Sequence, residues 1–103
     1  MKFIIMPRGC GKTTWACREA ARLHCPILTA GNPKIYKDRC RDLGLPPVAV
    51  HTVQEVIDRK FFSAYVIVDE VDAVLEQLLI GAGIVPTFGT LSLDKEPFRG
   101  EFQ

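Results

Sequence analysis

The 103-residue sequence predicts an α/β fold, a mostly parallel five-stranded sheet with helices on both faces. Three observations lead to this prediction. Short apolar runs alternate with segments whose apolar residues recur at helical spacing. A glycine-bearing turn follows the first apolar run, and two adjacent acidic residues end the fourth. In open α/β sheets the carboxyl ends of the strands meet at one edge, where ligands bind.

The first motif is the turn at residues 6–14, which joins the apolar run 2–6 to a helical pattern. Strand, glycine-bearing turn and helix N-terminus form the context that a phosphate-binding loop requires. Gly9 and Gly11 allow a tight bend that turns backbone N–H groups inward, and the helix dipole adds positive potential there. We expect the phosphate groups of a nucleotide to contact Arg8, Gly9, Cys10, Gly11, Lys12, Thr13 and Thr14.

Two side chains of this turn have specific expected roles. Lys12 can reach the β- and γ-phosphates, and Thr13 can place its hydroxyl on Mg²⁺. The pattern G-x-x-x-x-G-K-[ST] is broken at one position, where Met6 replaces the first glycine. That position ends the strand, and a side chain is tolerated there if φ stays negative. The alternative is an accidental Gly-Lys-Thr in a turn, which the second motif below disfavours.

The next segments predict a helix over 13–24, a strand over 26–30 and a second helix. Asn32 is a good N-cap and Pro33 a good first residue for that helix, and Gly44 suits its end. Its apolar face carries Ile35, Tyr36, Cys40 and Leu43. Its basic residues are Lys34, Lys37, Arg39 and Arg41. This basic face indicates either a solvated surface or a contact with a nucleic-acid backbone or a second subunit.

A third strand is expected over 48–51, and a capping box, Thr52 to Glu55, then begins a short helix. This helix should run to about Lys60. Its buried residues should be Val53, Val56 and Ile57.

The second motif is the apolar strand 64–70, which ends in Asp69 and Glu70. If the chain is a nucleotide hydrolase, Asp69 would hold Mg²⁺, usually through a water molecule bound to the ion, and Glu70 would polarise the attacking water. Two adjacent carboxylates at a buried strand end are costly unless a cation compensates them. Without Mg²⁺, Lys12 should therefore be drawn to this pair. The alternative is an acidic helix N-terminus, which the helix dipole also favours.

After this motif we expect a helix over 71–80 and a fifth strand over 84–90, weakened by Pro86. One face of the helix should carry Val71, Val74, Leu75, Leu78 and Leu79. The alternating residues 91–95 should pair beside Lys2–Ile5, within the molecule or across a dimer, and so cover an open sheet edge.

Composition predicts one globular domain over 1–103, in which 91–103 form a tail or edge strand. The apolar fraction is 48% and the net charge +1, so no basic excess indicates a nucleic-acid footprint. The four cysteines form no C-x-x-C pair, and no run has the character of a signal peptide or a membrane span. We therefore expect a cytoplasmic protein with reduced thiols and no membrane partner.

Taken together, the two motifs make residues 2–90 resemble P-loop NTPases of the additional-strand, catalytic-Glu division. The resemblance implies ATP and Mg²⁺ as ligands, with Glu70 and Lys12 as catalytic residues. It also implies a sensor residue, Thr87 or Thr90, on a strand that separates the two motif-bearing strands.

Within that division the order of elements is similar to the first motor domain of superfamily 1 and 2 helicases. Residues 28–32 and 51–52 look like the helicase elements that touch single-stranded nucleic acid. The chain is also similar to small stand-alone P-loop proteins of phages. No final strand flanks the first one and no second motor domain follows, so autonomous helicase activity is not expected. A catalytic arginine would come from a neighbouring subunit, and the candidates are Arg39, Arg59 and Arg99.

These observations predict an Mg²⁺-dependent ATPase with slow turnover in nucleic-acid metabolism or phage-type DNA processing, within an assembly. Its partners would be nucleotide, and single-stranded nucleic acid, another protein or a second copy of the chain. The alternative is a nucleotide- or partner-binding regulatory module that does not hydrolyse. A nucleoside kinase is less favoured: thymidine kinases also combine a P-loop with an Asp-Glu strand end, but this chain lacks the cysteine spacing of their zinc-bearing lasso.

Overall fold

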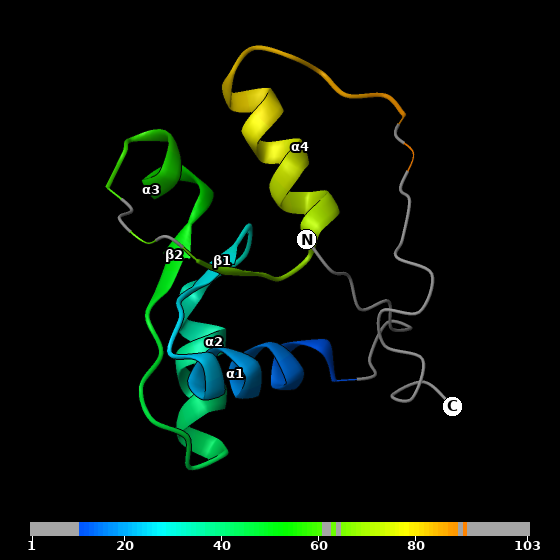
Figure 1. Cartoon of the computed structure of the whole chain (residues 1–103). Helices are drawn as coiled ribbons and strands as arrows, with labels where there is room; N and C mark the ends of the chain where they lie inside the picture. Colours follow the sequence, from blue (N-terminus) through cyan, green and yellow to red (C-terminus); the bar gives the residue numbers. More distant parts are fainter. Residues whose placement is uncertain (1–10, 61–62, 64, 89, 91–103) are drawn as a thin grey trace.

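The computed structural model describes residues 11–60, 63, 65–88 and 90, which form a small α/β fold with a three-stranded parallel sheet and four helices (Figure 1). In chain order the elements are α1 (Lys12–Leu23), β1 (Ile27–Thr29), α2 (Pro33–Asp42), β2 (Val50–Thr52), α3 (Val53–Ile57), β3 (Ile67–Val68) and α4 (Val71–Gly81). None of the helices in this described part has the length and hydrophobicity that crossing a membrane requires.

The central strand of the sheet is β1, which pairs in parallel with β2 on one side and with β3 on the other. The register places Thr29, the last residue of β1, beside Thr52, the last residue of β2. On the other side the Asp69 amide donates to the Leu28 carbonyl at 3.1 Å. The carboxyl ends of all three strands therefore lie along one edge, as expected for a ligand-binding α/β sheet.

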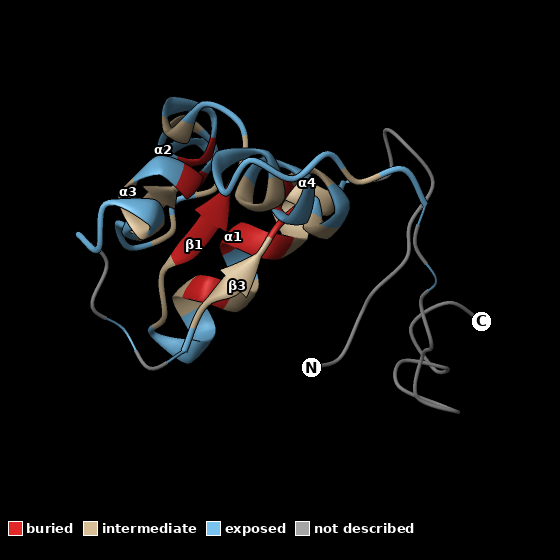
Figure 2. Cartoon of the chain, turned by 90° about the horizontal axis from the view of Figure 1, so that it is seen from above, coloured by how far each residue is buried: buried red, intermediate tan, exposed pale blue. Residues whose placement is uncertain are grey.

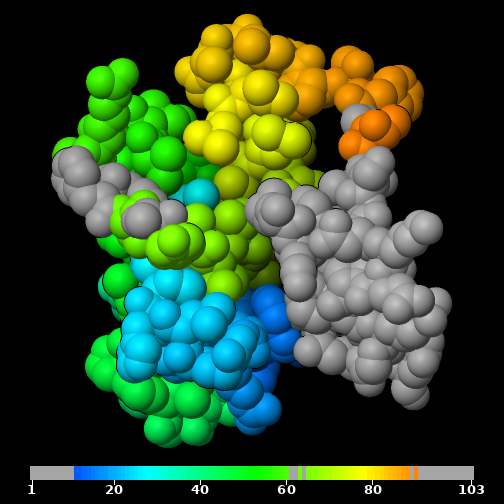
Figure 3. All heavy atoms as spheres, in the orientation of Figure 1, coloured from blue at the N-terminus to red at the C-terminus, as the bar shows by residue number. Residues whose placement is uncertain are grey.

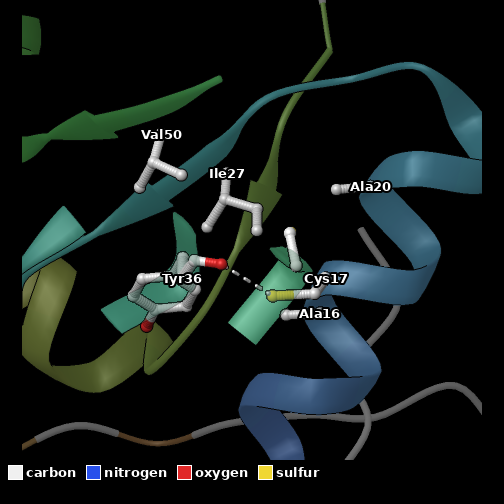
Figure 4. Close-up of a cluster of buried hydrophobic side chains, with 7 residues drawn as sticks. Ala16, Cys17, Ala20, Ile27, Tyr36 and Val50 are labelled. Atoms are coloured by element: carbon white, nitrogen blue, oxygen red, sulfur yellow. Dashed lines mark hydrogen bonds between the residues drawn. The ribbon is translucent and has the colours of Figure 1, made fainter. Parts of the chain in front are cut away.

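Adjacent residues of β1 face opposite layers, because side chains alternate along a strand. Ile27 is fully buried among residues of α1, α2 and β2, some of them drawn in Figure 4. These residues are Ala16, Cys17, Ala20, Tyr36, Cys40 and Val50. Leu28 belongs to a second cluster with Val53 of α3 and Val74 of α4. Helices therefore pack on both faces of the sheet (Figure 1). The buried residues concentrate on β1 and α1, as Figure 2 shows.

The predicted starts of α2 and α3 are confirmed by their hydrogen bonds. Asn32 Oδ1 accepts from the Lys34 amide at 3.0 Å, and Pro33 is the first residue of α2. Thr52 Oγ1 accepts from the Glu55 amide at 3.2 Å, and Glu55 Oε1 accepts in return from the Thr52 amide at 3.4 Å. Both caps satisfy N–H groups that a helix leaves unpaired at its start. The helix α3 is shorter than predicted, and Ile57 is exposed rather than buried.

The predicted apolar face of α4 is only partly correct. Val74 is 4% exposed, whereas Leu75 is 54% exposed, and Ile80 near the end of the helix is also exposed. Adjacent residues lie about 100° apart around a helix, so a face that packs Val74 against β1 and α3 turns Leu75 outward. The yellow atoms of α4 accordingly form part of the outer surface in Figure 3.

The predicted fifth strand over 84–90 is wrong where the structure describes it. Residues 84–88 have no strand conformation, and Val85 and Phe88 are 79% and 99% exposed. Pro86 has no N–H group to donate to a sheet ladder. Among the described residues the sheet therefore has three strands instead of five. The predicted strands at 2–6 and 91–95, and the pairing between them, lie outside the described residues.

Candidate nucleotide-binding site

The residue that precedes α1, Gly11, has a left-handed backbone conformation, which glycine adopts more easily than any other residue. Gly11 has φ 85° and ψ 27°, and a Cβ built there would meet no atom within 4 Å. The residue is therefore required for its left-handed backbone and not for space, because that region costs other residues about 1–2 kcal/mol. Lys12 follows as the first helical residue, and Trp15 N donates to Gly11 O at 2.9 Å.

The predicted phosphate-contacting residues divide into two groups in the structure. Lys12, Thr13 and Thr14 occupy the first turn of α1, where backbone N–H groups have no partner within the helix. This is the geometry that favours an anion at a helix N-terminus. The other group, Arg8, Gly9 and Cys10, lies outside the described residues.

The two sequence motifs meet through a salt bridge. Lys12 Nζ lies 3.1 Å from Glu70 Oε1, and the side chains are 31% and 46% exposed. The predicted attraction of Lys12 to the acidic pair is therefore present, and it is directed to Glu70. An ion pair this exposed contributes roughly 0–1 kcal/mol. Lys12 can therefore leave Glu70 for a more highly charged partner at little cost.

Glu70 has an unusual backbone conformation for the residue before a helix. Its φ of 57° and ψ of 63° lie in the left-handed region, and its side chain caps no N–H of α4. Most N-cap residues are extended, so this conformation costs on the order of 1–3 kcal/mol. Backbone strain of this kind concentrates at functional sites. The Glu70 carboxylate contacts Lys12 instead of serving as a cap.

Asp69 is 6% exposed, directly after β3, and its carboxylate has a buried partner. Tyr36 Oη, from α2, donates to Asp69 Oδ2 at 2.5 Å. Burial, and then the hydrogen bond to Asp69, raise the pKa of Tyr36 well above its usual value. The phenol therefore stays protonated and donates, and a hydrogen bond to a carboxylate is stronger than one between neutral groups.

A second buried hydroxyl continues this contact to the end of β1. Thr29 Oγ1 donates to Tyr36 Oη at 3.1 Å and accepts from the Gly31 amide at 2.9 Å. The donors run in one direction, from Gly31 through Thr29 and Tyr36 to Asp69. The apolar spacing of the sequence predicts only that Tyr36 lies on the apolar face of α2, and it does not predict this role. A signal was present, since a buried tyrosine usually needs a partner for its hydroxyl.

The helix α2 also reaches the first turn of α1. Arg39 Nη1 donates to Thr14 Oγ1 at 2.5 Å. Of the three proposed catalytic arginines, Arg39 is thus beside the candidate site of its own chain, Arg59 is exposed after α3, and Arg99 lies outside the described residues.

Other basic residues of α2 have acidic partners. Lys34 and Arg41 both contact Asp38, at 2.9 Å and 3.5 Å. Part of the basic face of α2 is therefore already paired within the helix.

Asp69 offers the carboxylate oxygens through which proteins commonly bind Mg²⁺. Tyr36 engages Asp69 Oδ2, while Oδ1 has no hydrogen bond to the described residues. None of the described residues therefore competes with a cation, or with its water, for that oxygen. Thr13, in the first turn of α1, offers the hydroxyl that the motif assigns to the same ion. Thr87, proposed as a sensor, is exposed in the segment that forms no strand.

Comparison of the chain with protein-family models, with curated proteins and with solved structures gives no match.

Proposed function

We propose that the protein binds ATP with Mg²⁺ and hydrolyses it slowly. The observation that carries this proposal is the 3.1 Å contact between Lys12, the first residue of α1, and Glu70, which directly follows the buried Asp69. Two motifs distant in the sequence thus meet at the carboxyl edge of a parallel sheet. This is the edge at which α/β proteins bind nucleotides.

Each residue has a defined part in the proposed reaction. The N–H groups at the start of α1 and the Lys12 ammonium bind the phosphates. Asp69 and Thr13 would hold Mg²⁺, which when bound neutralises phosphate charge. Because the salt bridge is weak, an arriving triphosphate takes Lys12 from Glu70. The freed Glu70 carboxylate then orients the attacking water and accepts its proton.

The choice of ATP, and a role in nucleic-acid metabolism or phage-type DNA processing, come from the resemblance to P-loop NTPases. Single-stranded nucleic acid, another protein or a second copy of the chain are proposed partners. A second candidate function is nucleotide binding without turnover. It is favoured by Met6, which replaces the first glycine of the P-loop pattern.

The first prediction tests nucleotide binding. In calorimetric titration with ATP and Mg²⁺, Lys12→Ala should bind about 10- to 100-fold more weakly than wild type, because a charge-assisted hydrogen bond contributes roughly 1.5–3 kcal/mol. Lys34→Ala is the matched control, since it removes the same charge from a lysine paired with Asp38. Equal affinities for Lys12→Ala and wild type would refute the proposal.

The second prediction separates hydrolysis from binding. Glu70→Gln keeps the shape of the side chain but removes the charge, so steady phosphate release should disappear while ATP affinity stays nearly unchanged. Release is measured with and without single-stranded DNA or RNA, across protein concentration. Glu76→Gln, at an exposed position of α4, is the control. Release that persists in Glu70→Gln would contradict the role of this residue, and no release from wild type under any condition would support the non-hydrolysing module.

A further inference from the structure

We propose that Tyr36 is a positioning residue for the Mg²⁺ ligand: it fixes Oδ2 of Asp69 and leaves Oδ1 as the oxygen that the cation or its water meets. This inference rests on the proposed function. It gives a role in that function to α2, a helix that lies outside both sequence motifs. Tyr36 is not itself a ligand, because it acts through Asp69.

The first support is the burial and continuity of the hydrogen bonds. Tyr36, Thr29 and Asp69 are 5%, 1% and 6% exposed, and they come from α2, the end of β1 and the end of β3. Their contacts of 3.1 Å and 2.5 Å form one chain in which each hydroxyl both accepts and donates. Away from water such bonds are stronger and polarise one another. This series of hydrogen bonds therefore holds the Asp69 carboxylate in one orientation.

The second support is the requirement of the cation. Mg²⁺ demands nearly ideal octahedral geometry, so it tolerates little rotation of a coordinating carboxylate. When a residue that hydrogen-bonds to a metal ligand is mutated, the metal affinity typically falls about 10- to 100-fold. Tyr36 is in such a position, because among the described residues its hydroxyl is the group that donates a hydrogen bond to the Asp69 carboxylate.

A purely structural role is the competing explanation. Tyr36 also belongs to the buried cluster with Ile27 and Cys40, so its loss could affect folding alone. Tyr36→Phe separates the two explanations, because it retains the ring and removes only the hydroxyl. A structural role changes the free energy of unfolding, whereas a positioning role also changes the dependence of nucleotide binding on the metal.

The experiment measures ATP affinity by calorimetry with and without Mg²⁺, and binding of Mn²⁺ to the protein–ATP complex by electron paramagnetic resonance. For Tyr36→Phe we expect about 10- to 100-fold weaker Mn²⁺ binding and a matching loss of Mg²⁺-dependent ATP affinity. ATP affinity without metal should be nearly unchanged. Tyr65→Phe is the matched control, because it removes the same hydroxyl from a side chain that is 79% exposed.

A double-mutant cycle with Asp69→Ala makes the test specific. If Tyr36 acts through Asp69, Tyr36→Phe should have no further effect on Mn²⁺ binding once Asp69 is replaced. Should Tyr36→Phe fold poorly, Thr29→Val leaves the Tyr36–Asp69 bond in place and should cause a smaller loss in the same direction. Wild-type metal dependence in a folded Tyr36→Phe or Thr29→Val variant would overturn the positioning role alone. Absence of ATP binding by wild type would overturn both this inference and the proposed function.

Discussion

Lys12 and Asp69 have partners that differ in burial, and this difference separates their roles. The Lys12–Glu70 pair is about one-third to one-half exposed, whereas Asp69 and Tyr36 are almost completely buried. An exposed ion pair contributes little to stability and exchanges readily. A buried charge that loses its partner costs several kcal/mol. We therefore expect Lys12 to move on ligand binding and Asp69 to remain in place.

Cys17 carries a prediction about pH at the same scale. Its side chain is fully buried, and Sγ donates to the Tyr36 carbonyl at 3.7 Å (Figure 4). Burial, and then the neighbouring Cys40, raise the pKa of the Cys17 thiol to about 12 from 9.0. Above pH 9 the unfolded thiol loses its proton and the folded one does not. The stabilisation is therefore complete below pH 9 and is lost as pH rises toward 12.

The measurement is the free energy of unfolding in urea at pH 7, 9 and 10. Between these values wild type should lose more stability than Cys17→Ala, each protein being compared with itself at pH 7. The Tyr36 hydroxyl, which also titrates at high pH, is present in both proteins and cancels in the comparison. Parallel pH dependences would show that Cys17 does not contribute.

At the scale of elements, α2 connects the two motifs. Tyr36 contacts Asp69 after β3, and Arg39, three residues later on the same side of the helix, contacts Thr14 in α1. A change in the position of α2 would therefore affect the first turn of α1, where we propose that phosphate binds, and the acidic pair together. The sequence predicts an apolar face and a basic face for this helix, whereas its inward polar contacts arise only from the packing of three elements.

The helix α4 offers a matched pair of substitutions. Val74→Ala removes two buried methyl groups, so it should cost at least about 1.5 kcal/mol, from roughly 0.8 kcal/mol for each group plus a cavity term. Leu75→Ala, at a half-exposed position, should change stability by less than about 0.5 kcal/mol. Urea unfolding of both variants checks this prediction. A larger loss for Leu75→Ala would mean that the outer face of α4 is covered in solution.

At the scale of the whole molecule, the candidate site joins the two helical layers. Lys12 begins α1, which packs on the Ile27 side of the sheet, and Glu70 precedes α4, which packs on the Leu28 side. Their salt bridge joins the start of α1 to the residue that follows the β3 end of the sheet. A nucleotide bound at Lys12 would therefore act on the contact between the two halves of the fold.

The sequence by itself determined the elements whose causes are local. Asn32 and Pro33 begin α2, the Thr52 capping box begins α3, and Gly11 begins α1, because each depends on backbone groups within a few residues. The alternation of strands and helices likewise follows from the spacing of apolar residues. The meeting of Lys12 with the acidic pair was predictable as well, because opposite charges placed at the same sheet edge attract.

Only the tertiary structure decided the features whose causes are distant in the chain. Tyr36 became the partner of Asp69 because the packing of α2 against the sheet brings two residues from different elements together in a place without water. Val74 rather than Leu75 became the buried residue of α4 because the position of α3 and β1 selects one side of that helix. Residues 84–88 form no strand, although their composition resembles one, because none of the described strands pairs with them and Pro86 has no N–H group to donate.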